Sequence, residues 1–274
     1  REEDSRDRAQ RDQEKLAMKA VLLMAYGTPK RLEDVEAYYT HIRGGRKPSP
    51  EELENLVERY RAIGGTSPLM GITESQGVKL QSRLRASSSK TRVYSAMKHS
   101  PPFIADVVKE VAADGVDQLL GIVLAPHYSK MSIGSYVKAV EDANSILRKR
   151  MKLDFVLSWN ENPKLIEVWC ERISDAEKKL RGNYRLVFSA HSLPARILSE
   201  GDPYRDQLLK TSTLIANKAG KDRWSFSFQS ASHSREPWLG PDILEHLDSL
   251  HEEGERTFLV APIGFVSDHL EILY

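Results

Sequence analysis

Side chains that could do chemistry stand at four places where apolar stretches of the sequence end. The clearest is His191, which follows the apolar residues 186–188 and comes shortly before Pro194, a residue that cannot continue a strand ladder. The others are Tyr26, His127 and the segment 267–271. An imidazole, a phenol and a carboxylate at one site suit a divalent first-row metal or proton transfer. We therefore expect metal handling or proton transfer.

Each of these positions also has a purely structural interpretation. Asp268 and Glu271 have the spacing of a capping box at the start of a helix. His127 is typical of a core histidine bonded to a carbonyl, and Tyr26 of a strand-end aromatic with a hydrated hydroxyl. The pattern alone leaves both interpretations open. We expect the histidines in polar or helical surroundings to be solvated, namely His41, His233, His246 and His251.

Basic residues gather in loops of the first third of the chain, beside Tyr60 and Ser67. The planar guanidinium of arginine binds carboxylates with two parallel hydrogen bonds, so a ligand with several carboxylates would suit this set. For Lys47 and Arg61 a solvated helix face is the favoured interpretation. The sequence has no GxGxxG motif and no P-loop, so nothing in it points to a nucleotide. The basic residues are Arg43, Arg46, Lys47, Arg59 and Arg61.

The elements that must position these residues alternate between strands and helices. This order predicts an α/β protein with two doubly wound, Rossmann-like domains, each with a parallel sheet and right-handed crossovers. We place the domains at residues 19–160 and 161–274, with a hinge near residue 160. The predicted strands are 19–26, 91–97, 117–126, 153–159, 185–190, 224–229 and 256–262. The predicted helices are 31–43, 50–63, 72–85, one ending near 113, 132–149, 163–181, 204–219, 239–253 and one opening near 268.

Composition limits the classes of partner. The net charge of +1 favours neither nucleic acid nor an acidic membrane surface. Cys170 is the single cysteine, which excludes an intrachain disulfide and fits a reducing compartment. Residues 1–18 are a charged extension or tag without the apolar stretch of a secretory signal, and no apolar run approaches the ~20 residues of a membrane span. We expect a cytoplasmic protein with no transmembrane segment.

Several motifs in a fixed order are similar to those of one enzyme family. They are LLMAYGTP (22–29), YYTHIRGGRKP (38–48), RYRAIGGTSPL (59–69), LAPHYS (124–129), LVFSAHSLP with GDPY (186–204), FQS (228–230), PWLGPD (237–242) and APIGFVSDHLEILY (261–274). From about residue 19 to its end, the chain resembles the ferrochelatases. The MAYGTP and YYTHIR forms look most like the Gram-positive type, the coproporphyrin III ferrochelatases. The resemblance implies the chelatase fold, with an active cleft between the two domains.

The resemblance also implies roles for individual residues. His191 and Glu271 match the pair that handles the metal and deprotonates the porphyrin. Tyr26 matches a tyrosine on the other side of the macrocycle, an axial ligand of the product iron. Other matching positions line the porphyrin and its propionates, namely Arg43, Arg59, Tyr60, Ser67, Tyr136, His99 and Trp238. The implied partners are a porphyrin, most closely coproporphyrin III, and substrate Fe²⁺. We expect a monomer that contacts enzymes of the haem pathway transiently.

Three departures from the family and three rival functions accompany this resemblance. Ser199 and the segment ASHSRE (231–236) differ from the usual residues, and we expect the C-terminal segment of the family to be absent after Tyr274. With Cys170 alone, the chain is expected to hold no 2Fe–2S cluster and no cofactor besides substrate Fe²⁺. The rivals are a protoporphyrin IX ferrochelatase, a non-catalytic porphyrin or haem carrier on the same fold, and a cobalt or nickel chelatase. Those last enzymes usually rely on paired histidines, so the Glu271 partner disfavours them.

Overall fold

The computed structural model describes residues 17–87, 89–231 and 236–274, which form two compact units. Unit 1 comprises residues up to Leu124, Ser135–Val156 and Ser267–Tyr274, and unit 2 comprises Ala125–Gly134 and Leu157–Val266. The predicted domain boundaries, 19–160 and 161–274, stay a prediction. Most of the predicted N-terminal extension, residues 1–16, and His233 lie outside the described residues.

A four-stranded parallel sheet forms the centre of unit 1, in the order β2-β1-β3-β4. The second residue of β1 and every residue after it is buried, which matches the continuous apolar run expected of a strand covered on both faces. The strands are β1 (Lys19–Ala25), β2 (Arg92–Met97), β3 (Gln118–Val123) and β4 (Lys152–Val156).

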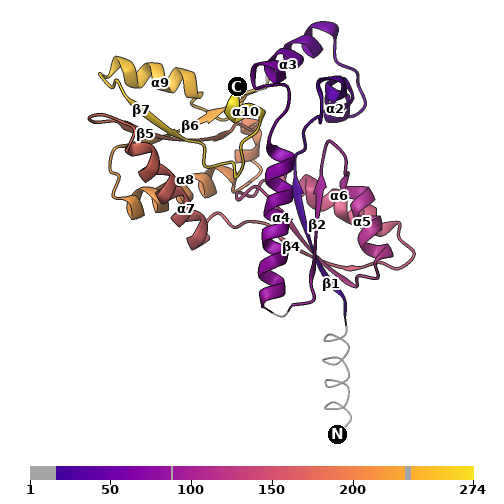
Figure 1. The fold of residues 1–274 in the computed structure, drawn as a ribbon. Helices are drawn as coiled ribbons and strands as arrows, with labels where there is room; N and C mark the ends of the chain where they lie inside the picture. Colours follow the sequence, from indigo (N-terminus) through magenta and orange to yellow (C-terminus); the bar gives the residue numbers. More distant parts are fainter. Residues whose placement is uncertain (1–16, 88, 232–235) are drawn as a thin grey trace. The chain divides into compact units, whose positions relative to one another are not determined.

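Helices cover both faces of this sheet, with α4 on one side and α5 and α6 on the other (Figure 1). The start of α3 is fixed by a capping box, in which Ser49 and Glu52 satisfy each other's backbone N–H groups. The helical elements of unit 1 are η1 (Leu32–Asp34), α2 (Val35–Ile42), α3 (Pro50–Ala62), α4 (Leu69–Ala86), α5 (Ile104–Ala113), α6 (Ile133–Ser145, which begins in unit 2) and α10 (Leu270–Leu273).

Unit 2 contains a three-stranded parallel sheet in the order β6-β5-β7, so β5 is the central strand. In Figure 1, α9 lies over one face of the sheet and α7 and α8 over the other. Asn162 and Asp242 cap α7 and α9 through their side chains. The elements are β5 (Arg185–His191), β6 (Trp224–Gln229), β7 (Phe258–Ala261), α7 (Pro163–Glu177), η2 (Ala195–Leu198), α8 (Tyr204–Ala219) and α9 (Ile243–Glu252).

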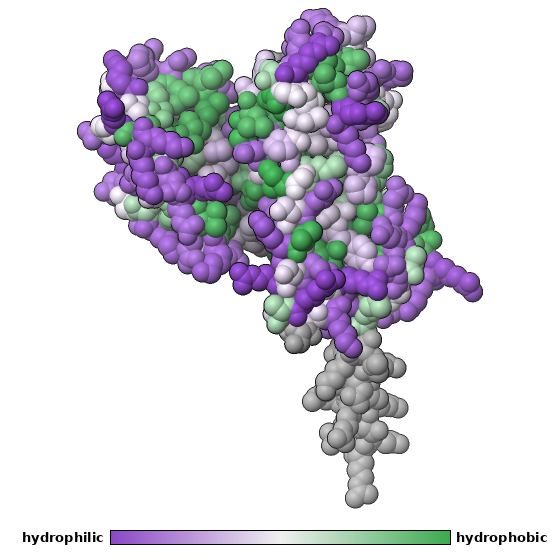
Figure 2. All heavy atoms as spheres, in the orientation of Figure 1, coloured by the Kyte–Doolittle hydropathy of each residue, from purple (hydrophilic) through white to green (hydrophobic). Residues whose placement is uncertain are grey.

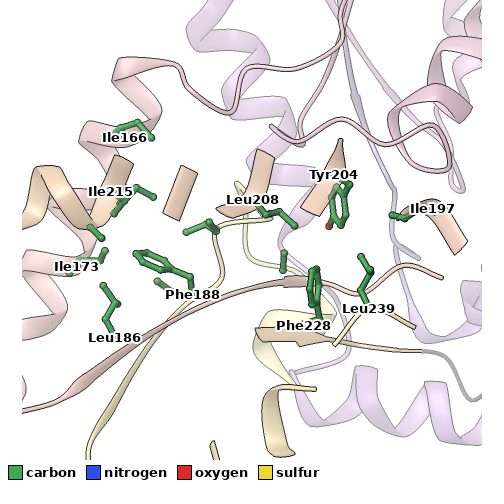
Figure 3. Close-up of a cluster of buried hydrophobic side chains, with 14 residues drawn as sticks. Ile166, Ile173, Leu186, Phe188, Ile197, Tyr204, Leu208, Ile215, Phe228 and Leu239 are labelled. Carbon is green, nitrogen blue, oxygen red and sulfur yellow. The ribbon is translucent and has the colours of Figure 1, made fainter. Parts of the chain in front are cut away.

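The core of unit 2 packs β5 against helices α7 and α8 (Figure 3). Leu186 and Phe188 of β5 are fully buried together with Leu208 and Ile215 of α8, and Ile173 of α7 is almost so. Burying one such side chain contributes about 1.5–3 kcal/mol relative to leaving it in water. This packing fixes the position of β5 along its whole length, and therefore of the residue at its end.

The predicted fold class is confirmed, because the chain is an α/β protein with two parallel sheets interleaved with helices. The element bounds differ in detail. The helix predicted from residue 239 begins at Ile243, after its Asp242 cap, and the short helix η2 was not predicted. The surface in view is mainly hydrophilic, with hydrophobic residues in separate groups (Figure 2). No helix of the described residues is long and apolar enough to cross a membrane.

Candidate active site

His191 is the last residue of β5 and lies only partly buried. Its Nδ1 is within hydrogen-bond distance of the carbonyl oxygen of Ser192. A carbonyl can only accept, so Nδ1 must carry the proton, and the lone pair of the neutral ring is then on Nε2. The contact therefore sets the tautomer in which Nε2 can accept a proton or bind a metal ion.

The backbone that carries His191 is held from three sides. The Tyr204 hydroxyl donates to the His191 carbonyl at 3.0 Å, and Gln229 pairs with His191 in the sheet. On the other side, a Cβ placed on Gly264 would lie 2.7 Å from the Cβ of Ala190, so only glycine fits this approach. The imidazole is thus mounted on a rigid strand end, the position where open α/β sheets bind ligands.

Trp238 lies beside the segment that follows His191. Pro194 and Trp238 form an isolated antiparallel bridge, and the Leu239 N–H donates to the Leu193 carbonyl at 2.9 Å. The Ser192 hydroxyl donates to the Leu239 carbonyl at 2.7 Å. These bonds tie the loop after β6 to the loop after β5, so unit 2 brings Trp238 and His191 to one end of its sheet.

In unit 1, Tyr26 directly follows β1 and keeps 45% of its surface exposed. Around it, the Tyr38 hydroxyl donates to the Gly27 carbonyl at 3.1 Å, and the hydroxyls of Tyr60 and Thr28 lie 3.3 Å apart. Partial burial, then the Glu271 carboxylate and the Tyr60 hydroxyl, raise the pKa of the Tyr26 phenol to about 12. The phenol is therefore protonated at neutral pH in the protein without ligand.

Glu271 belongs to this same group of side chains in unit 1. Its charge also raises the pKa of Tyr60 and Tyr38, in both cases after the larger effect of burial. Its carboxylate lies 3.9 Å from Nε2 of His269. The capping-box interpretation does not hold, because α10 begins after His269 and has no side-chain cap hydrogen bond.

His99 connects Tyr26 to a second histidine. The ring centroids of Tyr26 and His99 lie 4.5 Å apart, and Nδ1 of His99 is 3.0 Å from Nδ1 of His41. Burial, Lys98 and His41 lower the pKa of His99 to about 4, so its ring is neutral at pH 7. His41 also stacks on Phe103, and it is exposed, as the sequence predicted.

Tyr136 is buried, and its phenol pKa is raised by burial and by Tyr26. Nζ of Lys98 lies 4.9 Å from the centre of the Tyr136 ring and donates to the Ser135 hydroxyl at 2.5 Å. Burial lowers the pKa of the Lys98 amine. Lys98 and Tyr38 were not singled out from the sequence. Tyr38 stands in the YYTHIR motif, so a signal existed for it.

The remaining predicted residues of unit 1 have partners near them in the chain or at Tyr274, the residue after α10. Arg43 donates from Nη1 to Glu52 at 2.6 Å, and the Arg59 guanidinium lies 5.5 Å from the centre of the Tyr274 ring. The Ser67 hydroxyl accepts from the Leu69 N–H at 3.3 Å and so helps to start α4. None of these contacts by itself identifies a ligand.

His127 is a core histidine, as its structural interpretation predicted, but its partner is a hydroxyl. Nε2 lies 3.0 Å from Oγ1 of Thr211, which donates its own proton to the carbonyl of Asn160 or Gln207. Thr211 therefore accepts from Nε2–H. Burial lowers the pKa of His127 to about 3, so this ring stays neutral.

Within each unit, several predicted residues come together. In unit 1, ring contact or electrostatic interaction links Tyr26 to four others, which are Tyr60, His99, Tyr136 and Glu271. In unit 2, His191 and Trp238 lie at the same end of the sheet. Unit 1 thus groups phenols with a carboxylate and an imidazole, which are side chains that can exchange protons.

Comparison with known proteins gives a consistent result. The family model described as Ferrochelatase matches residues 18–274. The chain is 48% identical over 263 residues to "Ferrochelatase" of Herpetosiphon aurantiacus, covering 94% of this chain and 86% of the relative. It is 45% identical over 262 residues to "Coproporphyrin III ferrochelatase" of Oceanobacillus iheyensis, covering 93% and 83%. It is 46% identical over 265 residues to "Coproporphyrin III ferrochelatase 1" of Bacillus anthracis, covering 93% and 84%. The resemblance inferred from the motifs is confirmed: this chain belongs to the ferrochelatase family.

Proposed function

We propose that this protein inserts Fe²⁺ into coproporphyrin III and releases Fe-coproporphyrin III. The observation that carries the proposal is the match over nearly the whole chain to relatives that bear this name, at 45–46% identity. Metal insertion also suits the chemistry available in each unit. His191 offers an Nε2 lone pair on a fixed strand end, and unit 1 groups a carboxylate with phenols.

The proposed reaction replaces two N–H protons of the porphyrin by one Fe²⁺ ion. His191 accepts the two protons in turn at Nε2, since its Nδ1 is committed to the Ser192 carbonyl, and gives up the first before it takes the second. Glu271 passes the proton on or holds the incoming metal ion. Tyr26 serves the opposite face of the macrocycle and binds the product iron axially. Residues that press on the ring would pucker it and turn its nitrogen lone pairs toward the metal.

Binding energy from contacts far from the porphyrin nitrogens would offset the cost of this distortion. We assign the binding of the ring and its four propionates to the other residues identified from the motifs, which are Arg43, Arg59, Tyr60, Ser67, Tyr136, His99 and Trp238. A porphyrin with four carboxylates would use more cationic donors than protoporphyrin IX, which has two. Arg43 and Arg59 are the strongest candidates, because guanidinium groups bind carboxylates with two hydrogen bonds.

We further propose a cytoplasmic monomer that contacts other haem-pathway enzymes transiently and binds no nucleic acid. Substrate Fe²⁺ is the metal of the reaction, and no 2Fe–2S cluster or other resident cofactor is assigned. The lone Cys170 is consistent with a reducing compartment.

The proposed function is tested by anaerobic incubation of the protein with Fe²⁺ and either coproporphyrin III or protoporphyrin IX, followed by absorbance. We expect Fe²⁺ insertion into coproporphyrin III to saturate with substrate. Its kcat/KM should be higher than that for protoporphyrin IX. Faster turnover of protoporphyrin IX would favour the protoporphyrin enzyme. Binding of coproporphyrin III without insertion of Fe²⁺ or Zn²⁺ would favour the carrier.

A further inference from the structure

Arg43, which we propose to bind a porphyrin carboxylate, is already paired with a carboxylate of the protein. Its Nη1 lies 2.6 Å from Oε1 of Glu52, and its guanidinium lies 5.5 Å from the centre of the Tyr39 ring. Nε of Arg43 is buried and has no hydrogen-bond partner among the described residues. The arginine therefore makes one ion pair, and its Nε donor is unused among the described residues.

Glu52 is held in place by a second interaction that does not involve Arg43. Its Oε2 accepts the backbone N–H of Ser49 at 2.7 Å, as part of the capping box that starts α3. The Ser49 amide, and then the Arg43 guanidinium, hold the pKa of Glu52 below its ordinary value, so the carboxylate is charged at neutral pH. Loss of Arg43 as a partner would leave Glu52 capped and in water, with 41% of its side chain exposed.

We propose that Glu52 pairs with Arg43 before the porphyrin binds, and that a carboxylate of the porphyrin then replaces Glu52 at the guanidinium. This inference rests on the proposed function and identifies Glu52 as a residue that sets the affinity for a carboxylate-bearing porphyrin. Binding exchanges one arginine–carboxylate pair for another, so the net gain from Arg43 is small while Glu52 is present. The exchange limits how tightly the product is held and favours its release.

Replacement of Glu52 by Gln separates the two roles of the side chain. The amide oxygen of Gln still accepts the Ser49 N–H, so the helix cap is retained, but the neutral group no longer competes for Arg43. Glu54 supplies a matched control on the same helix, because it forms a similar exposed pair with Arg61 at 2.7 Å. The variants are therefore E52Q, E54Q, R43A and the double variant R43A/E52Q.

The experiment measures the Kd of metal-free coproporphyrin III by quenching of its fluorescence, with circular dichroism to verify folding. We expect E52Q to bind roughly two- to fivefold more tightly than the wild type, the range that an exposed ion pair contributes. E54Q should bind like the wild type. In the R43A background, the Glu52→Gln change should have no effect, because no arginine remains to be released.

Equal or weaker binding by E52Q would overturn the inference, since Glu52 would then be neutral or would orient Arg43 for the substrate. Tighter binding of E52Q that persists without Arg43 would also overturn it, since the effect would not pass through the arginine. In both cases the wild type still binds coproporphyrin III and inserts iron, so the proposed function stands. A wild type that does not bind coproporphyrin III would overturn both.

Discussion

Two histidines of unit 2 show how surroundings, more than residue type, decide what an imidazole can do. His191 stands partly exposed at a strand end, with Nδ1 committed to a carbonyl. His127 is 2% exposed and donates from Nε2 to Thr211. The sequence placed both after apolar strands, and only burial and hydrogen bonding distinguish them. His191 is therefore suited to accept a proton at Nε2, whereas His127 stays neutral.

The buried His127 predicts acid sensitivity. Its pKa is about 3 in the folded protein and about 6.5 in an unfolded chain, so below pH 6.5 the unfolded state binds a proton that the folded state does not. The contribution of this group to the free energy of unfolding is complete above about pH 6.5. As the pH decreases toward 3, this contribution is lost at about 1.4 kcal/mol per pH unit. His99, with a pKa of about 4, acts in the same direction.

The replacement His127→Gln keeps a donor for Thr211 and removes the titration. Urea unfolding at pH 7, 6 and 5 should therefore show a shallower loss of stability than in the wild type, by up to about 1.4 kcal/mol per pH unit. His251→Gln, at an exposed position, is the control for replacing a histidine by glutamine. An unaltered slope in H127Q would contradict the neutral, buried state of His127.

At the scale of elements, apolar runs bounded by turn residues predicted the strands well. The predicted strands 185–190 and 224–229 match β5 and β6 within one residue, because Leu186–Phe188 and the aromatics of β6 pack against helices along their length. The first residues of helices were predicted less accurately than the strands. The helix predicted over 239–253 starts too early, because Trp238 and Leu239 pair with the 193–194 segment instead and α9 begins at Ile243.

Side-chain partners across elements could not be predicted from the sequence. The pairing of Arg43 with Glu52, the contact of His41 with His99 and the placement of Lys98 beside Tyr136 depend on how helices and loops pack. Local pattern contains no information on such distances. The motifs identified Tyr26, Tyr60 and Glu271 as candidates, but only the packing of α10 in unit 1 brings the carboxylate to the phenols.

The close approach of Gly264 to β5 predicts a steric effect on the strand end that carries His191. In Gly264→Ala, the new Cβ would lie 2.7 Å from Cβ and 3.1 Å from Cα of Ala190. Such crowding costs about 1–3 kcal/mol and shifts the backbone next to His191. We expect lower stability in urea unfolding and slower Fe²⁺ insertion.

Gly71→Ala is the matched control. Gly71 lies exposed within α4, and its added Cβ would meet nothing within 4 Å. Alanine should stabilise the protein by about 0.4–1 kcal/mol there and leave insertion unchanged. If G264A were as stable and active as the wild type, the tight contact with Ala190 would not constrain the strand end.

At the scale of the whole molecule, the proposed mechanism uses groups from both units. Unit 2 supplies His191, and unit 1 supplies Glu271 and Tyr26. Residues that act as one catalytic device give strongly non-additive losses when they are removed together. The two units can therefore be tested for joint action without assuming any distance between them.

We expect His191→Ala and Glu271→Gln each to slow Fe²⁺ insertion, and the double variant to be little slower than H191A alone. Initial rates at saturating coproporphyrin III measure this, with His251→Ala as a control for loss of an exposed histidine of unit 2. Losses that simply multiply in the double variant would indicate two independent functions.

The most direct test of the central claim is the rate of Fe²⁺ insertion by His191→Ala, measured beside its affinity for coproporphyrin III. If His191 accepts the porphyrin proton, the variant should lose at least about 10²-fold in turnover, the usual contribution of a general base. Its Kd for the metal-free porphyrin should stay close to that of the wild type. Turnover near the wild-type rate would contradict the assignment of His191, and with it the proposed mechanism.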